Sequence, residues 1–94
     1  MAEKFYRDIW GRTHLDPGYN TVPQKPYEID SPASGDGVTY IRYEDKDTCA
    51  IHRVTSATSN GRKTTKIEIA YGAWADRATL EYEPAANYPK EVEE

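Results

Sequence analysis

Few residues of this chain have the types and spacing that chemistry requires. The single cysteine, Cys49, lies three positions before His52, and an activated thiol would need the imidazole to face it. Both residues fall in a segment with strand-like composition, where positions an odd number apart point to opposite sides. We therefore expect Cys49 to be a small buried apolar residue and His52 to be a residue of the sheet rather than a general base.

Other catalytic or metal-binding arrangements find little support. His14 and Asp16 could supply two ligands to a metal, but one Cys and two His make no zinc motif. The six glycines form neither a GxGxxG pattern nor a Walker loop, and no motif gathers a hydrolase triad. We therefore expect no catalytic residues, no metal and no cofactor, and we expect that the protein is not an enzyme.

The elements that would position functional side chains are mainly β-strands. β-Branched and aromatic residues are dense in Val38–Tyr43 and Thr48–Ser56, while polar and apolar residues alternate in Lys63–Tyr71. Asn60-Gly61 predicts a tight hairpin, because a type I′ turn needs positive φ at both central residues. Ala78–Glu83 alternates again and predicts a fourth strand, with a helix over Ala73–Glu83 as the alternative.

Residues 2–10 allow a short helix that stops at Gly11. Phe5 and Ile9 are four positions apart, as are Tyr6 and Trp10, and this spacing is typical of one helical face. A strand over Lys4–Ile9 is the alternative.

The fold class expected is mostly β (α+β). It is a three- to four-stranded antiparallel β-meander with a short N-terminal helix and a proline-rich irregular covering segment, residues 12–37, which includes a short edge strand around Tyr27–Ile29. Residues 1–84 would form a single domain, and residues 85–94 an acidic C-terminal tail. With no secretory signal and no apolar run of membrane-spanning length, we expect a cytoplasmic protein without membrane contact.

Charge is unevenly distributed along the chain, whose net charge is −4. Residues 28–47 and 76–94 are rich in acids. Residues 48–67 contain four basic residues and no acidic one. The Asn60-Gly61 hairpin is therefore a basic projection on an acidic protein.

A protein-binding function is the expectation that best fits these patterns. Eight Tyr and two Trp exceed what the thin core of a small domain needs, and such residues are enriched at interfaces. We expect an accessory, adaptor or inhibitor that occupies a surface of another protein, such as a phage- or mobile-element-encoded inhibitor of a nucleic-acid-handling partner. A homodimer would follow from an uncovered sheet face. The candidate contacts are Tyr40, Tyr43, Trp74 and Tyr82 among the aromatic residues and Glu44, Asp45 and Asp47 among the acidic residues.

Nucleic-acid binding through the basic hairpin is the alternative function. Cations and hydroxyls on a protruding ribbon can contact phosphates, and tyrosine rings can stack on bases. The candidate phosphate contacts are Arg53, Arg62, Lys63 and Lys66.

Overall fold

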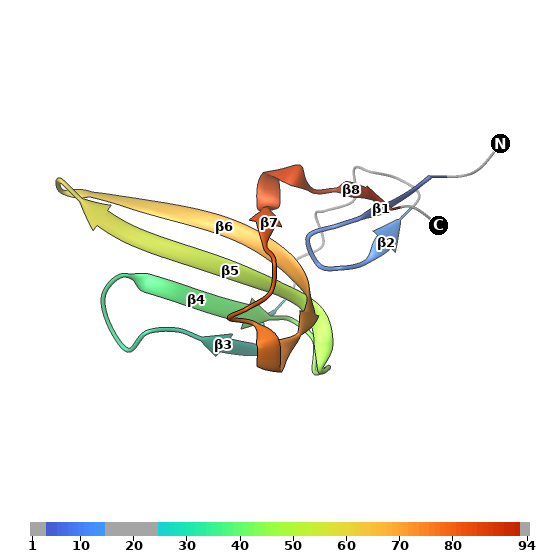
Figure 1. Ribbon diagram of the computed structural model, residues 1–94, viewed down its shortest axis with the longest axis horizontal. Helices are drawn as coiled ribbons and strands as arrows, with labels where there is room; N and C mark the ends of the chain where they lie inside the picture. The colour runs from blue at the N-terminus through green and yellow to red at the C-terminus, as the bar shows by residue number, and fades with distance from the viewer. Residues whose placement is uncertain (1–3, 15–24, 93–94) are drawn as a thin grey trace.

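Two antiparallel β-sheets make up the computed structural model, which describes residues 4–14 and 25–92 (Figure 1). The larger sheet has the strand order β3 (Glu28–Asp30), β4 (Gly37–Arg42), β5 (Thr48–Ser59), β6 (Arg62–Ala73) and β7 (Glu83–Pro84). The smaller sheet has the order β2 (Thr13–His14), β1 (Phe5–Arg7) and β8 (Lys90–Val92). Two 3-10 helices, η1 (Trp74–Asp76) and η2 (Ala85–Asn87), lie on either side of β7 in the sequence. No helix within the described residues has the length and apolar character needed to cross a membrane.

The expectation of an antiparallel, mostly β fold is confirmed, and the predicted strand count is wrong. Strands β4, β5 and β6 fall where β-branched and aromatic residues are dense, and β3 lies close to the expected edge strand. Asn60 and Gly61 both have positive φ, at 53° and 74°, as a type I′ hairpin requires. Five strands in one sheet and three in the other replace the three or four expected, since short segments near both termini add strands.

The predicted N-terminal helix is absent, and its alternative, a strand, is found. β1 pairs with β2 through a turn in which the carboxylate of Asp8 accepts hydrogen bonds from the backbone N–H groups of Trp10 and Arg12, both at 2.9 Å. Gly11 adopts φ of 83° within this turn. The four-residue spacing that suggested a helix instead belongs to a hairpin held by the buried Asp8 side chain.

The strand predicted over Ala78–Glu83 is also wrong, as is the helix over Ala73–Glu83. The chain leaves β6 at Ala73, forms η1, and turns back with a hydrogen bond from Thr79 N–H to the Asp76 carbonyl at 2.8 Å. Strand structure resumes only at Glu83. The alternation in this segment reflects contacts of Leu80 and Tyr82 with the sheet rather than pairing with a neighbouring strand.

Two other expected segments differ in part from the structure. Residues 85–92, expected to belong to a loose tail, contain η2 and the strand β8, which pairs with β1. Within the irregular segment, residues 25–27 and 31–36 lack regular structure and residues 28–30 form β3. Residues 15–24, including Asp16, and the side chain of His14 lie outside the described residues.

The core lies on both faces of the large sheet near its middle. Cross-strand register places Ile41, His52 and Ile69 on one face, here called the His52 face. It places Arg42, Ile51 and Ala70 in a row on the opposite face, which also carries Arg53 and is called the Arg53 face. Ile51 is fully buried, and Cys49, Ala50, Ile69 and Ala70 are at most 5% exposed.

Different segments cover the two faces. The β1–β2 hairpin covers the His52 face, where Trp10 stacks on His52 with ring centres 5.3 Å apart. The segment between β6 and β7 covers the Arg53 face, where Tyr82 contacts Tyr40.

The far end of the β5–β6 hairpin extends beyond its neighbours (Figure 1). β4 pairs with β5 only as far as Ser56, and β7 pairs with β6 only at Glu68 and Ile69. Among the strands formed by residues 4–14 and 25–92, none therefore pairs with the outer sides of residues 57–67, here called the finger.

Candidate interaction surface

An apolar strip lies open on the His52 face, beyond the part that the β1–β2 hairpin covers. It consists of two cross-strand pairs, Ile29 with Ile41 and Val54 with Ile67, which lie diagonally to each other because Ile41 is directly opposite His52 and Val54 is opposite Thr39. Ile29 is 55% exposed and Ile67 is 50% exposed, while Ile41 and Val54 are half-buried. Exposed branched aliphatic side chains grouped across strands form the kind of patch that marks an interaction site.

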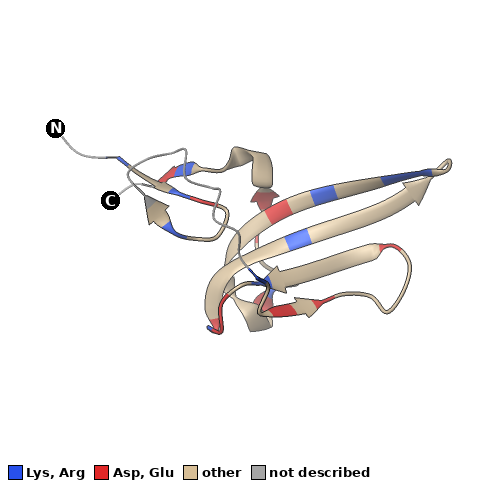
Figure 2. Cartoon of the chain, turned by 180° about the vertical axis from the view of Figure 1, so that it is seen from behind, with Lys and Arg blue, Asp and Glu red and all other residues tan. Residues whose placement is uncertain are grey.

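Basic residues lie along the finger near the tip of the β5–β6 hairpin (Figure 2). Lys63 alternates with Thr65 and Ile67 on the His52 face, while Arg62 and Lys66 point to the Arg53 face. All three basic residues are exposed, and within the described part of the chain none of them forms an ion pair. Lys63 is thus a positive charge without an ion-pair partner among the described residues, on the face of the strip and separated from Ile67 by Thr65.

Three of the four predicted aromatic contacts lie together on the Arg53 face. The rings of Tyr40 and Tyr82 are 6.3 Å apart, and the Arg53 guanidinium lies 4.2 Å from the Tyr82 ring centre. The Tyr82 hydroxyl donates a hydrogen bond to the Arg77 carbonyl at 2.8 Å, and burial raises the pKa of Tyr82 to about 12. Trp74 contacts Arg42 on the same face. Together these contacts hold the segment between β6 and β7 against the sheet.

Arginines neutralised by carboxylates surround Trp74. The guanidinium groups of Arg42 and Arg77 lie 5.1 and 4.4 Å from its ring centre. Arg42 also pairs with Glu28 at 2.6 Å, and Arg77 pairs with Asp30 at 3.0 Å. Cation–π contacts of this kind stabilise by about 0.5–1 kcal/mol at exposed sites.

Arg53 is engaged in the same way and lies apart from the other predicted phosphate contacts. Its guanidinium pairs with Glu68 at 2.8 Å, directly across the β5–β6 pair. Arg62, Lys63 and Lys66 are therefore the basic residues of this hairpin that remain exposed without an anion among the described residues.

The fourth aromatic candidate, Tyr43, lies on the opposite face beside His52. Its ring meets Trp10 edge-on at 4.8 Å, and burial raises the pKa of Tyr43. The Nε2–H group of His52 donates to the Ile9 carbonyl, and burial lowers the pKa of His52. Cys49 is on the Arg53 face, where burial raises the pKa of its thiol, so the two residues do not form a nucleophile–base pair.

The predicted acidic contacts lie in the turn between β4 and β5, at the opposite end of β5 from the finger (Figure 1). Glu44, Asp45 and Asp47 are exposed, and Glu44 pairs with Lys46 at 3.3 Å. The Asp47 carbonyl accepts a hydrogen bond from Trp74 N–H at 2.7 Å, which ties the turn to η1. The structure therefore places the acidic turn away from Ile67 and the finger.

Sequence reasoning missed the apolar strip as a surface. Ile67 shares the alternating pattern of Ile69, which predicts a buried face for both. Ile69 is 3% exposed and Ile67 is 50% exposed, because the covering hairpin ends between them. The available signal was the length of the strands, which exceeds what the short N-terminal segment can cover.

Among the described residues, no group of three or more His, Cys, Asp or Glu side chains is placed to hold a metal ion. Comparisons of the chain with protein-family models, with curated proteins and with solved structures found no match.

Proposed function

We propose that this chain is a small protein-binding module that acts by occupying a surface of a partner protein, as an accessory, adaptor or inhibitor. The observation that carries this proposal is the apolar strip, in which Ile29 and Ile67 are each at least half exposed on one face of the sheet. Burying the rest of one such side chain stabilises a complex by about 1 kcal/mol. Two isoleucines therefore favour association without any catalytic group.

The surroundings of the strip indicate the chemistry of the partner. Lys63 lies on the same face as Ile67, and the finger carries Arg62 and Lys66 on its other face. A partner surface with apolar side chains at its centre and carboxylates at its edge complements this arrangement. Attraction between these opposite charges would raise the association rate and would weaken as salt increases.

The acidic turn stays a separate prediction. Glu44, Asp45 and Asp47 remain exposed and would suit a basic partner surface, such as the groove of a nucleic-acid-handling protein. Replacing all three with Lys and measuring affinity and its salt dependence for the identified partner decides whether this end of the sheet takes part in binding.

Site-specific photo-crosslinking tests the proposed surface. A photoreactive amino acid at position 67 should capture one protein partner from the native lysate, and nuclease treatment should not reduce its recovery. The matched position is Thr64, which is also exposed on β6 but points to the Arg53 face. Equal capture of the same protein from positions 64 and 67 would contradict the assignment of the face.

Nucleic-acid binding is the second candidate function. Arg62, Lys63 and Lys66 support it, because they are exposed and have no ion-pair partner among the described residues. The affinity for single- or double-stranded probes should then fall steeply with salt, with a log–log slope of about −0.7 to −0.9 per neutralised phosphate. The absence of binding to both probes at low salt would exclude this function.

A further inference from the structure

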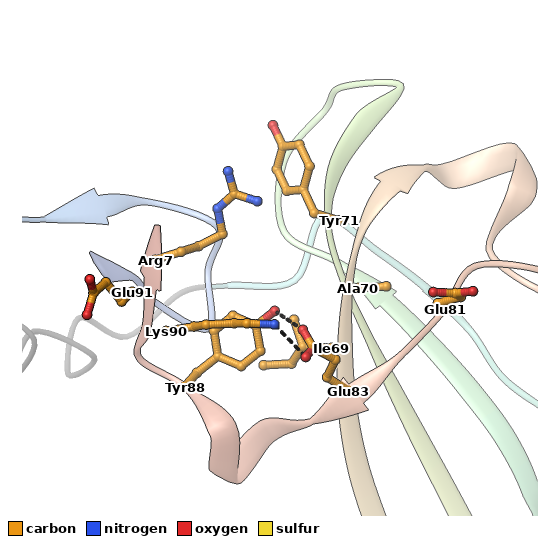
Figure 3. Close-up of a pocket in the computed structure, with 9 residues that line it drawn as sticks. All are labelled: Arg7, Ile69, Ala70, Tyr71, Glu81, Glu83, Tyr88, Lys90 and Glu91. Carbon is orange, nitrogen blue, oxygen red and sulfur yellow. Dashed lines mark hydrogen bonds and ion pairs between the residues drawn. The ribbon is translucent and has the colours of Figure 1, made fainter. Parts of the chain in front are cut away.

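A pocket of about 270 Å³ lies between the edge of β6 and the small sheet (Figure 3). Ile69, Ala70 and Tyr71 line it from β6, and Arg7 lines it from β1. None of these residues belongs to the apolar strip. The volume is slightly below the range of about 300–1,000 Å³ that is usual for drug-sized ligands. The pocket is therefore of a size for a small metabolite.

Arg7 brings an uncompensated positive charge to this pocket. Its guanidinium carbon lies 4.8 Å from the centre of the Tyr71 ring, and its Nε atom is buried without a hydrogen-bond partner. No carboxylate among the described residues forms an ion pair with it. Arg7 is also directly opposite Lys90 in the β1–β8 register, where like charges repel.

The Glu83 carboxylate already pairs with Lys90 and accepts a hydrogen bond from Tyr88. The Lys90 Nζ atom lies 2.5 Å from Glu83 Oε1, and the Tyr88 hydroxyl donates to Glu83 Oε2 at 3.2 Å (Figure 3). The hydrogen bond from Lys90 lowers the pKa of Glu83, as expected for a stable ion pair. Glu83 therefore compensates Lys90, and Arg7 is the cation lining the pocket that has no ion-pair partner among the described residues.

The remaining walls restrict which anion fits. The Tyr71 side chain presents most of the apolar surface of the pocket, because Tyr71 is 49% exposed whereas Ile69 and Ala70 are only 3% and 5% exposed. Glu81 lies on the side away from Arg7 (Figure 3). Glu81, Glu83 and Glu91 all line the pocket and would repel a ligand with several negative charges. A single negative charge on an apolar body satisfies both kinds of wall.

We infer that this pocket binds a small organic monocarboxylate. The ligand carboxylate accepts hydrogen bonds from the terminal nitrogens of Arg7, and its hydrocarbon body packs against the Tyr71 side chain. Arginine suits this task because its planar fork matches the two carboxylate oxygens. The site is independent of the apolar strip, so its failure would leave the proposed function unaffected.

NMR titration of the whole chain tests this inference, with hexanoate as the probe. Saturable shifts of backbone amides should be centred on residues 69–71 and 88–90. Succinate and inorganic phosphate should bind more weakly because of the acidic walls, and hexylamine should not bind. Shifts that avoid residues 69–71, or binding of hexylamine or phosphate as tight as that of hexanoate, would overturn the inference.

Two matched variants identify the residue that binds the carboxylate. Arg7→Gln should weaken hexanoate binding by about tenfold or more, the factor typical of a lost charge-assisted hydrogen bond. Arg12→Gln makes the same change of charge in the same hairpin at an exposed residue that does not line the pocket, and it should have little effect. Equal weakening by both variants would overturn the role of Arg7. The titration of the unaltered chain decides the matter if Arg7→Gln does not fold.

Discussion

Leu80 lies directly against Gly72, so that a β-carbon built on this glycine would be only 2.7 Å from Leu80 Cδ2. This contact explains why the segment after β6 folds back over the Arg53 face. A residue with a side chain at position 72 would hold Leu80 away from the sheet, and the aromatic contacts of Tyr82 would be displaced with it.

The fit of Leu80 over Gly72 predicts the result of a double-mutant cycle. Gly72→Ala should lower the free energy of unfolding by about 1 kcal/mol, because overpacking forces Leu80 to shift. In the Leu80→Ala background the same substitution should cost little, or should stabilise, since alanine has less freedom in the unfolded chain. Urea denaturation of the four proteins measures this coupling. An equal effect of Gly72→Ala in both backgrounds would show that the contact is absent.

Burial of His52 predicts that stability depends on pH. Since the pKa of His52 is lowered in the folded protein, the unfolded chain binds a proton more readily below the ordinary value of about 6.5. The free energy of unfolding should therefore be highest above this pH and should fall on acidification. His52 should contribute at most about 1.4 kcal/mol of this fall per pH unit. Urea denaturation at a series of pH values from about 7.5 to about 5 measures how the free energy of unfolding changes.

Replacement of each histidine assigns this pH dependence. His52→Gln should remove the component centred near the ordinary histidine pKa, although it also lowers overall stability through loss of the contact with Trp10. His14→Gln removes the other imidazole of the chain and should retain that component. The reverse pattern would be incompatible with a buried neutral His52.

The Asp8 carboxylate is predicted to hold the β1–β2 turn. Asp8→Ala leaves the N–H groups of Trp10 and Arg12 without this acceptor and should cost about 1–3 kcal/mol. Asp8→Asn keeps an oxygen in the same place and should cost less. Hydrogen exchange of the amides in β1 and β2 provides the readout. Similar loss of protection in both variants would mean that the charge, rather than the oxygen acceptor, is what matters.

The ion pair between Lys90 and Glu83 makes a prediction about a single titration. Lys90→Met should raise the pKa of Glu83 toward its ordinary value, because the hydrogen bond from Lys90 is the main cause of its lowering. Carbon-detected NMR of the Glu83 carboxyl group follows the titration directly. Lys4→Met removes a cation that pairs with Glu91 instead and should leave the Glu83 titration unchanged. If both variants had the same effect, the pairing would be wrong.

Local sequence signals were sufficient for the central strands. The hairpin at Asn60-Gly61 depends on positive φ at adjacent residues, and the flanking strands depend on β-branched and alternating side chains. These signals are contained in a few neighbouring residues, so they can be read without knowledge of the rest of the molecule.

Contacts between distant segments decided the elements that sequence reasoning missed. The spacing of Phe5 and Ile9 fits both a helix and a strand, and the choice depends on the Asp8 turn and on pairing with β8. The alternation after Ala78 likewise reflects contact with Gly72 and Tyr40.

The candidate surface depends on contacts of the same kind. Tyr82 and Trp74 were expected to be core or interface residues, and only the packed arginines reveal their structural role. The exposure of Ile67 follows from where the covering hairpin ends, which no pattern within β6 encodes.

Binding through the apolar strip is tested most directly by the affinity of two variants for the partner, purified after its identification by crosslinking. Ile67→Asp and Thr64→Asp add the same charge to exposed positions of β6 that point to opposite faces of the sheet. Ile67→Asp should weaken binding by at least about tenfold, as for a residue at the centre of an interface, and Thr64→Asp should change it little. Equal affinities of the two variants, or a larger loss for Thr64→Asp, would contradict binding through the apolar strip.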